Sequence, residues 1–137
     1  MKVYSTCRIT RLVDLYMRVG SRNKARNFVG HIGELMILLL HKMQLHKILR
    51  RRYRSPIGEI DLIVQDRQML YFIEVKASTN SQFREVPLTA KQRNSIVRTA
   101  RYFLSRHPQF AEHQISFEVY CVSLTHGITR FSNAWQE

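Results

Sequence analysis

The residues that could carry out chemistry lie on two neighbouring stretches, 59–65 and 69–77, which are rich in Ile, Val, Leu, Phe and Tyr. Both compositions predict β-strands, and the polar residues Asp66, Arg67 and Gln68 between them predict the turn of a hairpin. The sequence therefore places acidic and basic side chains on a pair of antiparallel strands, where their spacing can be worked out.

A turn centred on residues 67–68 puts Asp61 directly opposite Glu74. Opposed residues of an antiparallel pair have Cβ atoms about 4.5–5.5 Å apart, and two carboxylates at that distance repel each other. The pair needs a positive charge, which Lys76 on the face of Glu74 or a divalent metal could supply, and Mg²⁺ suits two converging hard oxygens. A register shifted by one residue would instead put Asp61 on the face opposite Glu74.

Residues 33–49 are apolar on most sides and contain no proline, which predicts a helix buried against a sheet. Glu34 stands at the start of this stretch. Its carboxylate could belong to a functional site, or it could be a first-turn residue favoured by the helix dipole, and both interpretations stay open. His31, His41 and His46 lack the spacing of a zinc pair, which favours structural roles for them.

A second helix and two further strands are predicted in the remaining sequence. Thr89 followed by Gln92 three residues later predicts a capping box, and the helix that follows is expected to stop before Pro108. Residues 115–124 predict another strand, and residues 128–135 a short last strand or tail.

The chain is strongly basic, with 22 Lys and Arg against 10 Asp and Glu and a formal net charge of +12. Such a surface attracts polyanions, of which nucleic acid is the leading class and an anionic membrane surface an alternative. Basic side chains concentrate in residues 47–54, predicted as a loop, and on the polar face of the second helix. The residues expected to contact phosphates are Arg50, Arg51, Arg52, Arg54 and Lys91.

The length of 137 residues, 45% of them hydrophobic, predicts a single domain with a real core. Residues 1–29 contain seven Lys or Arg and one acidic residue, so we expect a basic N-terminal extension there and the folded domain over residues 30–137. The extension could track phosphates or be an appendage without a role in binding.

Cys7 and Cys121 lie far apart in the sequence and form no metal-ligand spacing, which favours reduced, structural cysteines. The most apolar run, residues 35–40, is far shorter than the roughly twenty residues that span a bilayer, and the N-terminus lacks a signal-peptide core. We therefore expect a cytoplasmic protein that does not bind a membrane.

The order of these motifs resembles the YraN-type family of small bacterial proteins, which belongs to the restriction-endonuclease-like PD-(D/E)XK superfamily and is similar to archaeal Holliday-junction resolvases. The resemblance covers Gly30 onward, about three-quarters of the chain. The segments that carry it are Gly30-His31-Ile32-Gly33-Glu34, Gly58-Glu59-Ile60-Asp61-Leu62-Ile63, Phe72-Ile73-Glu74-Val75-Lys76, then Lys91, Ala100, Leu104, Phe117-Glu118-Val119 and Asn133-Ala134-Trp135.

The resemblance implies an α/β fold of the restriction-endonuclease-like type, with a mixed central sheet flanked by helices. It implies that Asp61 and Glu74 bind Mg²⁺, with Mn²⁺ as a substitute, helped by the main-chain carbonyl of Val75. Glu34 would supply a further acid from the first helix, and Lys76 would orient or deprotonate the attacking water while the metal stabilises charge on the phosphate.

This chain departs from the family pattern in three places. Ser78 stands where members often carry an arginine, which puts one expected phosphate contact in doubt. Glu118 replaces an aspartate in the later strand, and residues 1–29 have no evident counterpart. The four polar positions of the expected active site are all present.

The sequence thus predicts a Mg²⁺-dependent nuclease that hydrolyses phosphodiester bonds in DNA. The alternative is a DNA- or RNA-binding protein that keeps the nuclease fold with little turnover. A basic module that docks on acidic protein or lipid has only the net charge in its favour. A homodimer is left open, because two coordinated cuts at a junction require two such sites.

Overall fold

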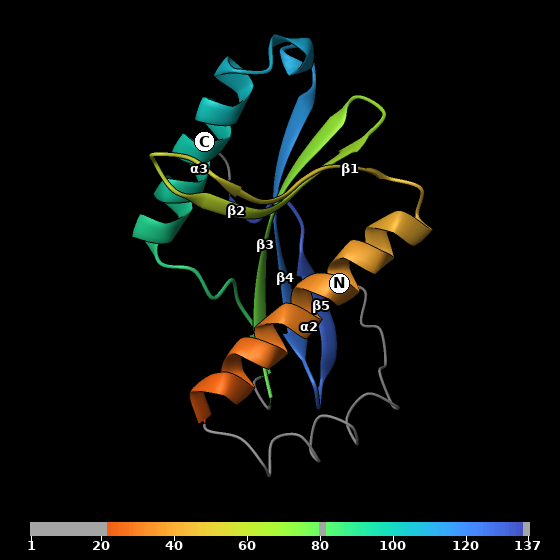
Figure 1. Cartoon of the computed structure of the whole chain (residues 1–137), viewed down its shortest axis with the longest axis vertical. Helices are drawn as coiled ribbons and strands as arrows, with labels where there is room; N and C mark the ends of the chain where they lie inside the picture. Colours follow the sequence, from red (N-terminus) through yellow and green to blue (C-terminus); the bar gives the residue numbers. More distant parts are fainter. Residues whose placement is uncertain (1–21, 80–81, 136–137) are drawn as a thin grey trace.

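The computed structural model describes residues 22–79 and 82–135 (Figure 1). Its elements, in chain order, are α2 (Arg22–Met43), β1 (Lys47–Arg54), β2 (Glu59–Asp66), β3 (Met69–Ser78), α3 (Ala90–Ser105), the short 3₁₀ helix η1 (Pro108–Phe110), β4 (Gln114–Ser123) and β5 (Gly127–Phe131).

The five strands form one sheet in the order β1-β2-β3-β4-β5. All neighbours are antiparallel except β3 and β4, which run parallel and are connected through α3. A parallel pair requires such a crossover, because the chain must return to the starting end of the sheet. The mixed sheet with its flanking helices confirms the predicted α/β, restriction-endonuclease-like fold.

Two hydrophobic clusters hold the helices on the sheet. On the α3 side, Ile96 and Phe103 pack with strand residues that include Ile63 and Phe72. On the α2 side, Ile37 and Leu38 pack with a second set of strand residues, Leu62, Val64, Ile73, Tyr120, Val122 and Ile128. Because strand side chains alternate between faces, one sheet supplies both clusters.

The predicted hairpin is confirmed, with its register. β2 and β3 are paired from Leu62 opposite Ile73 to Asp66 opposite Met69, and the turn residue Arg67 has a φ of 52°. The capping box is also confirmed, since Thr89 and Gln92 exchange side-chain and backbone hydrogen bonds at the start of α3.

Two predictions about the first half of the chain were wrong. The helix expected over residues 33–49 spans Arg22–Met43, and it ends where Leu45 adopts a φ of 61°. The basic stretch 47–54, expected to be a loop, forms β1. Its backbone groups find hydrogen-bond partners along the free edge of β2, which a solvated loop would not provide. Of the expected extension, residues 22–29 lie in α2, and residues 1–21 lie outside the described part.

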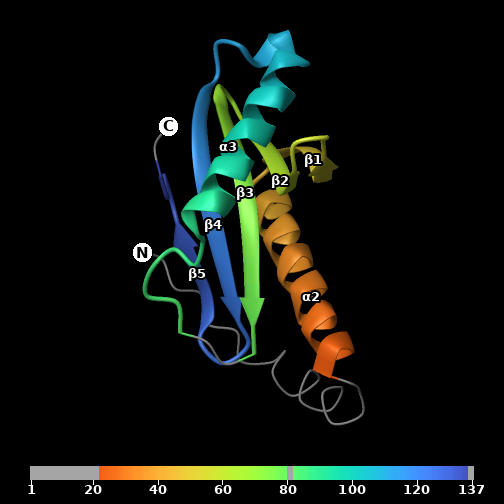
Figure 2. The ribbon, with the colours of Figure 1, turned by 90° about the vertical axis from the view of Figure 1, so that its left-hand side faces the viewer.

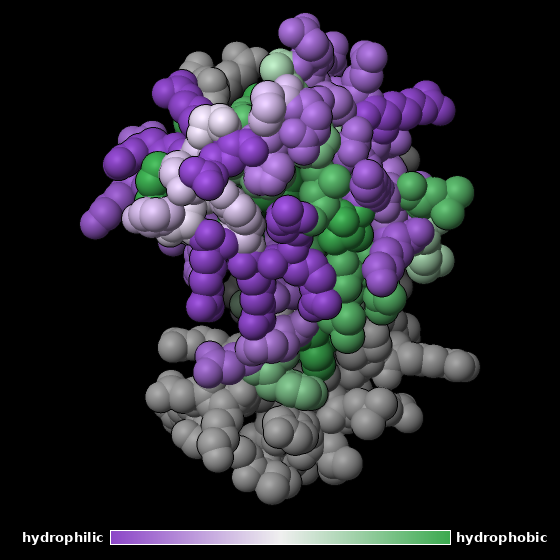
Figure 3. Space-filling view, turned by 45° about the horizontal axis from the view of Figure 1, so that its top comes forward, coloured by the Kyte–Doolittle hydropathy of each residue, from purple (hydrophilic) through white to green (hydrophobic). Residues whose placement is uncertain are grey.

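Part of the solvent-facing side of α2 is apolar. Leu35, Leu39 and Met43 recur every four residues along the helix and are exposed, Met43 by 83%. On the face drawn in Figure 3, hydrophilic side chains predominate beside a band of hydrophobic surface. Within the described residues, no helix has both the length and the apolar character that a membrane span requires. Cys121 is a buried free cysteine, and Cys7 lies outside the described residues.

Candidate active site

The candidate site lies where β2 and β3 diverge. Their backbone pairing stops at Leu62 opposite Ile73, and one residue further the Oδ2 atom of Asp61 accepts a hydrogen bond of 2.8 Å from the Val75 N–H. Figure 2 shows β1 and the start of β2 turning away from the long strands β3 and β4. The carboxylate of Asp61 thus takes the place of a backbone acceptor at the opening between the strands.

The bend at Asp61 interrupts the alternation of side chains along β2. Strict alternation would place Ile60 on the same face as Leu62, but Ile60 packs in the α3 cluster and Leu62 in the α2 cluster. Strict alternation fails here because β2 leaves its partner at this point and its backbone turns.

Glu74 and Lys76 stand two residues apart on β3, and Lys76 Nζ donates to Glu74 Oε1 at 2.7 Å. Both side chains are mostly buried, with 17% of Glu74 and 30% of Lys76 exposed. The lysine is therefore the direct counter-charge of Glu74, while Asp61 receives only a neutral N–H.

The carboxyl group of Asp61 is strongly perturbed. Burial raises its pKa, and the negative charge of Glu74 raises it further, to about 7. Glu34 adds a smaller contribution in the same direction, which the Val75 N–H and Lys76 oppose only in part. Two carboxylates with one lysine leave this part of the molecule short of positive charge.

Glu34 is brought towards the same region by close packing of α2 on β3. A Cβ atom on the preceding residue, Gly33, would lie 3.1 Å from the Cβ of Ala77, so the glycine allows the helix to approach the strand. The Glu34 carboxylate does not join Asp61 and Glu74. It forms a two-pronged ion pair with Arg52, from Nε to Oε2 at 2.8 Å and from Nη2 to Oε1 at 3.1 Å.

Comparison with known proteins identifies the family. The model of the "Uncharacterised protein family UPF0102" matches residues 33–122, which include all four acidic and basic residues of the candidate site. A UPF0102 protein of Ehrlichia ruminantium is 44% identical over 113 residues, which make up 82% of this chain and 87% of the relative. A UPF0102 protein of Ehrlichia chaffeensis is 40% identical over 111 residues, 81% of this chain and 89% of the relative.

The chain belongs to the UPF0102 family. This confirms the resemblance to the YraN-type family found in the sequence. The family's name states no activity, so the function of this UPF0102 member rests on the chemistry of the site.

The acidic residues of the site have the chemistry that a divalent cation needs, although their side chains do not converge on one point. Within residues 22–79 and 82–135, no group of three or more His, Cys, Asp or Glu side chains is arranged to hold a metal. The reason is visible in the ion pairs, since Glu34 turns to Arg52 and Glu74 to Lys76. Asp61 and Glu74 nevertheless provide hard oxygen donors, and only Glu74 of the two is paired with a cation, which leaves a negative charge of the kind that attracts Mg²⁺.

The raised pKa of Asp61 predicts how stability depends on pH in metal-free protein. Between pH 3.8 and about 7 the folded state holds a proton that the unfolded state has lost, so stability falls as pH rises through this range. At pH 8 the Asp61→Asn variant should be more stable than the parent by roughly 2 kcal/mol, allowing for partial exposure, and the difference should vanish near pH 4. Thermal unfolding in EDTA at both pH values measures this.

The matched control is Glu59→Gln, which changes an exposed acid on the same strand. It should shift the melting temperature little at either pH. An Asp61→Asn variant that is equally or less stable than the parent at pH 8 would show that the folded protein does not disfavour the ionised form of the Asp61 carboxyl group.

The residues expected to contact phosphates lie on exposed parts of the chain. Arg50, Arg51, Arg52 and Arg54 follow one another along β1, an edge strand of the sheet, and Lys91 lies in the first turn of α3. Arg54 makes an exposed ion pair with Glu59 at 3.4 Å. These arginines thus lie along an exposed edge of the sheet.

Sequence reasoning missed two polar clusters of this UPF0102 member, both on the α2 side of the sheet. Arg130 of β5 makes a two-pronged ion pair with Glu118, of which only 1% is exposed. The Nδ1 atoms of His41 and His46 lie 2.9 Å apart, and burial, with the charges of His46 and Arg130, lowers the pKa of His41 to about 4. The sequence feature that could have revealed this cluster is Glu118 itself, a single acidic residue within an apolar strand.

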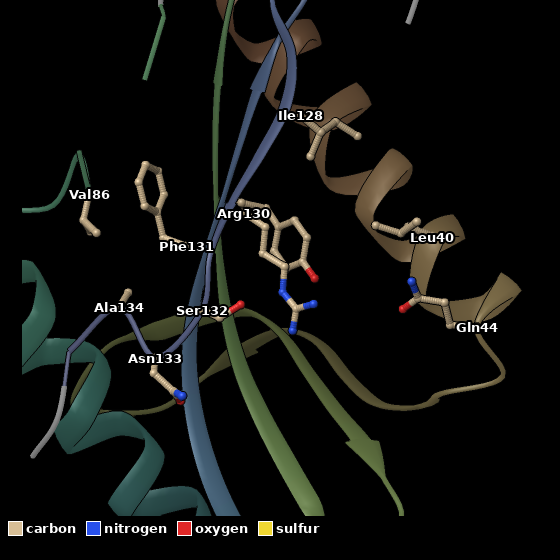
Figure 4. Close-up of a pocket in the computed structure, with 10 residues that line it drawn as sticks. Leu40, Gln44, Val86, Ile128, Arg130, Phe131, Ser132, Asn133 and Ala134 are labelled. Carbon is tan, nitrogen blue, oxygen red and sulfur yellow. The ribbon is translucent and has the colours of Figure 1, made fainter. Parts of the chain in front are cut away.

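A hollow of about 630 Å³ lies along β5, away from the predicted acids (Figure 4). Arg130 and Ile128 point into it from β5, facing Leu40 and Gln44 of α2. None of the predicted catalytic residues lines it.

Proposed function

We propose that this UPF0102 member is a Mg²⁺-dependent nuclease that hydrolyses phosphodiester bonds in DNA. The observation that carries the proposal is the pair Asp61 and Glu74 at the point where β2 and β3 diverge, with Lys76 beside it. A pair of partly buried carboxylates destabilises the free protein, and this arrangement makes physical sense where a cation is to be bound.

Three groups would hold the metal: the carboxylates of Asp61 and Glu74 and the main-chain carbonyl of Val75. The N–H of Val75 already points to Asp61, and the N–H and C=O of one strand residue leave the backbone on the same side. When bound, Mg²⁺ lowers the pKa of a coordinated water and offsets charge on the phosphate oxygens.

Lys76 lies where it could assist the attacking water or the phosphate. Its ammonium group is held 2.7 Å from the Glu74 carboxylate, so it lies beside the expected metal ligands and can donate to the attacking water or to a phosphate oxygen. The arginines of β1 would hold the sugar-phosphate backbone across the opening, which brings a phosphodiester to the two acids.

The test is cleavage of labelled linear, flapped and four-way DNA in Mg²⁺ or Mn²⁺, with EDTA as the blank. Metal-dependent cleavage of any of these supports the proposal, and the preferred substrate shape follows from the panel. Paired cuts in a four-way junction would further indicate a homodimer, because one chain carries one such site. DNA bound without cleavage under all metals would contradict the nuclease proposal.

The cationic strand predicts a salt dependence that is independent of catalysis. The double variant Arg50→Gln/Arg51→Gln should lower the slope of log affinity against log salt by roughly 1.8, because each phosphate contact contributes about 0.9. DNA binding measured in EDTA from low to moderate salt checks this. The control removes two arginines outside β1, Arg67 and Arg84, and an equal loss of slope there would contradict the assignment.

A second function is favoured by the ion pairs of the site. Glu34 and Glu74 are each neutralised by a basic side chain, and such a site can persist in a protein that binds nucleic acid and turns over little. In that case the β1 variants would lose affinity as predicted, while replacement of Asp61 would change nothing measurable except stability. The cytoplasmic location expected from the sequence remains a prediction.

A further inference from the structure

Arg52 is exposed like the other arginines of β1, but it lies beside the acids of the candidate site. Arg51 pairs with Leu62 and Tyr53 with Ile60, so the register sets Arg52 opposite Asp61. Its φ is 46°, a left-handed conformation that costs energy for any residue with a Cβ and that often marks functional positions. The strand is bent at this residue, which turns the guanidinium towards α2.

The guanidinium makes a specific contact there. Two parallel hydrogen bonds to Glu34, of 2.8 and 3.1 Å, form the Arg52–Glu34 clamp. The hydrogen bond and the charge of Glu34 raise the pKa of Arg52, and the charges of Asp61 and Glu59 act in the same direction. The clamp keeps the third carboxylate of the site away from the other two, so the free protein presents two acids where three are available.

We propose that Arg52 couples the binding of DNA to the binding of metal. In the free protein Arg52 holds Glu34; a DNA phosphate takes the guanidinium, and the released Glu34 then joins Asp61 and Glu74 around the cation. This inference rests on the proposed nuclease function and deepens it, because it assigns to Arg52 a positioning role that the other arginines of β1 lack.

When a DNA phosphate replaces the Glu34 carboxylate, the guanidinium of Arg52 keeps an anionic partner. A guanidinium matches the two oxygens of a phosphate as well as those of a carboxylate, and the Arg52 side chain is 45% exposed and so open to a polyanion. A released Glu34 adds charge beside Asp61, whose pKa is already raised by its neighbours. A third carboxylate strengthens the attraction for a divalent cation. Phosphate and metal therefore each favour the state in which the clamp is open.

Reciprocity makes this measurable without catalysis. If DNA opens the clamp, it raises the affinity for metal, and the metal must raise the affinity for DNA by the same factor. Part of any such effect comes from the phosphate charge itself. The contribution of the clamp to this coupling is the part that is lost when Arg52 no longer holds Glu34.

The experiment titrates Mn²⁺ into the full chain by calorimetry, alone and with a short phosphorothioate duplex that resists cleavage. We expect Arg52→Gln to bind Mn²⁺ about fivefold or more tightly without DNA, and the duplex to strengthen metal binding less in this variant than in the parent. Arg51→Gln is the control for loss of one charge on the same strand. It should weaken DNA binding but leave the coupling unchanged.

Glu34→Gln separates release of the acid from the simple loss of an arginine. In the double variant Arg52→Gln/Glu34→Gln, the gain in Mn²⁺ affinity should vanish, because no acid remains to be released. Equal Mn²⁺ affinity in the parent, Arg52→Gln and Arg51→Gln would overturn the clamp while leaving the nuclease proposal intact, provided that Asp61→Asn still abolishes metal binding. Absence of metal binding in the parent and in Arg52→Gln, with and without DNA, would overturn both.

Discussion

Replacing Asp61 by Asn should reduce DNA cleavage in Mg²⁺ by about a thousandfold or more and leave DNA binding intact or tighter. The Asn side chain can still accept the hydrogen bond of the Val75 N–H, so the opening between β2 and β3 keeps its shape. What is lost is the negative charge that, in the proposed mechanism, would bind the cation and through it stabilise the phosphate in the transition state. Single-turnover cleavage with protein in excess measures this loss without interference from product release.

Glu74→Gln should have an effect of similar size, because Glu74 is the other acid of the pair. The control for both variants is Glu59→Gln, which removes an acid of β2, the strand of Asp61, at an exposed position paired with Arg54. We expect the control to stay within about twofold of the parent. If Asp61→Asn cleaves as fast as Glu59→Gln, the metal-binding role of Asp61 is wrong, even where the protein proves to be a nuclease.

The hairpin and its register could be predicted from sequence because the information is local. A two-residue turn between two apolar strands leaves few registers, and a turn centred on residues 67–68 sets the register that the structure shows. The capping box at Thr89 and Gln92 could be predicted for the same reason, because two residues three positions apart mark the start of the helix.

β1 was missed because its residues give the opposite local signal. A run with Arg50, Arg51 and Arg52 is typical of a solvated loop, and its strand structure depends on pairing with β2, which lies later in the chain. An edge strand tolerates such charges, and they also discourage pairing with other chains. No pattern within the stretch itself could have shown which backbone it would bond to.

For the candidate site, the sequence pointed to the residues but not to their contacts. The register predicted from sequence brings Asp61 to the part of β3 that carries Glu74 and Val75, whereas the Arg52–Glu34 clamp joins residues 18 positions apart across a helix and an edge strand. Its formation depends on the close packing of Gly33 on Ala77 and on the bend of β1, both of which are tertiary features. Ion pairs of this kind cannot be read from spacing.

Breaking the buried ion pair of Glu118 should be the most damaging single change to stability outside the hydrophobic core. Arg130→Met leaves Glu118, 1% exposed, without the guanidinium that holds both of its oxygens, one at 3.0 Å. An uncompensated buried charge costs roughly 3 to 5 kcal/mol, a large share of the stability of a domain of this size. Urea denaturation at neutral pH measures the loss.

Two further variants decide whether charge or packing is responsible. The double variant Glu118→Leu/Arg130→Met removes both charges and should recover most of the loss, because two apolar side chains can replace a buried pair at little cost. Arg54→Met breaks an exposed pair, with 77% and 66% of the two side chains open to water, and should cost less than about 1 kcal/mol. If the double variant is as unstable as Arg130→Met, the arginine stabilises the fold by its packing over Tyr120, whose ring centre lies 5.7 Å from the guanidinium. Since β4 pairs with β3 along the residues that carry Glu74 and Lys76, recovery in the double variant should also preserve metal binding at the candidate site.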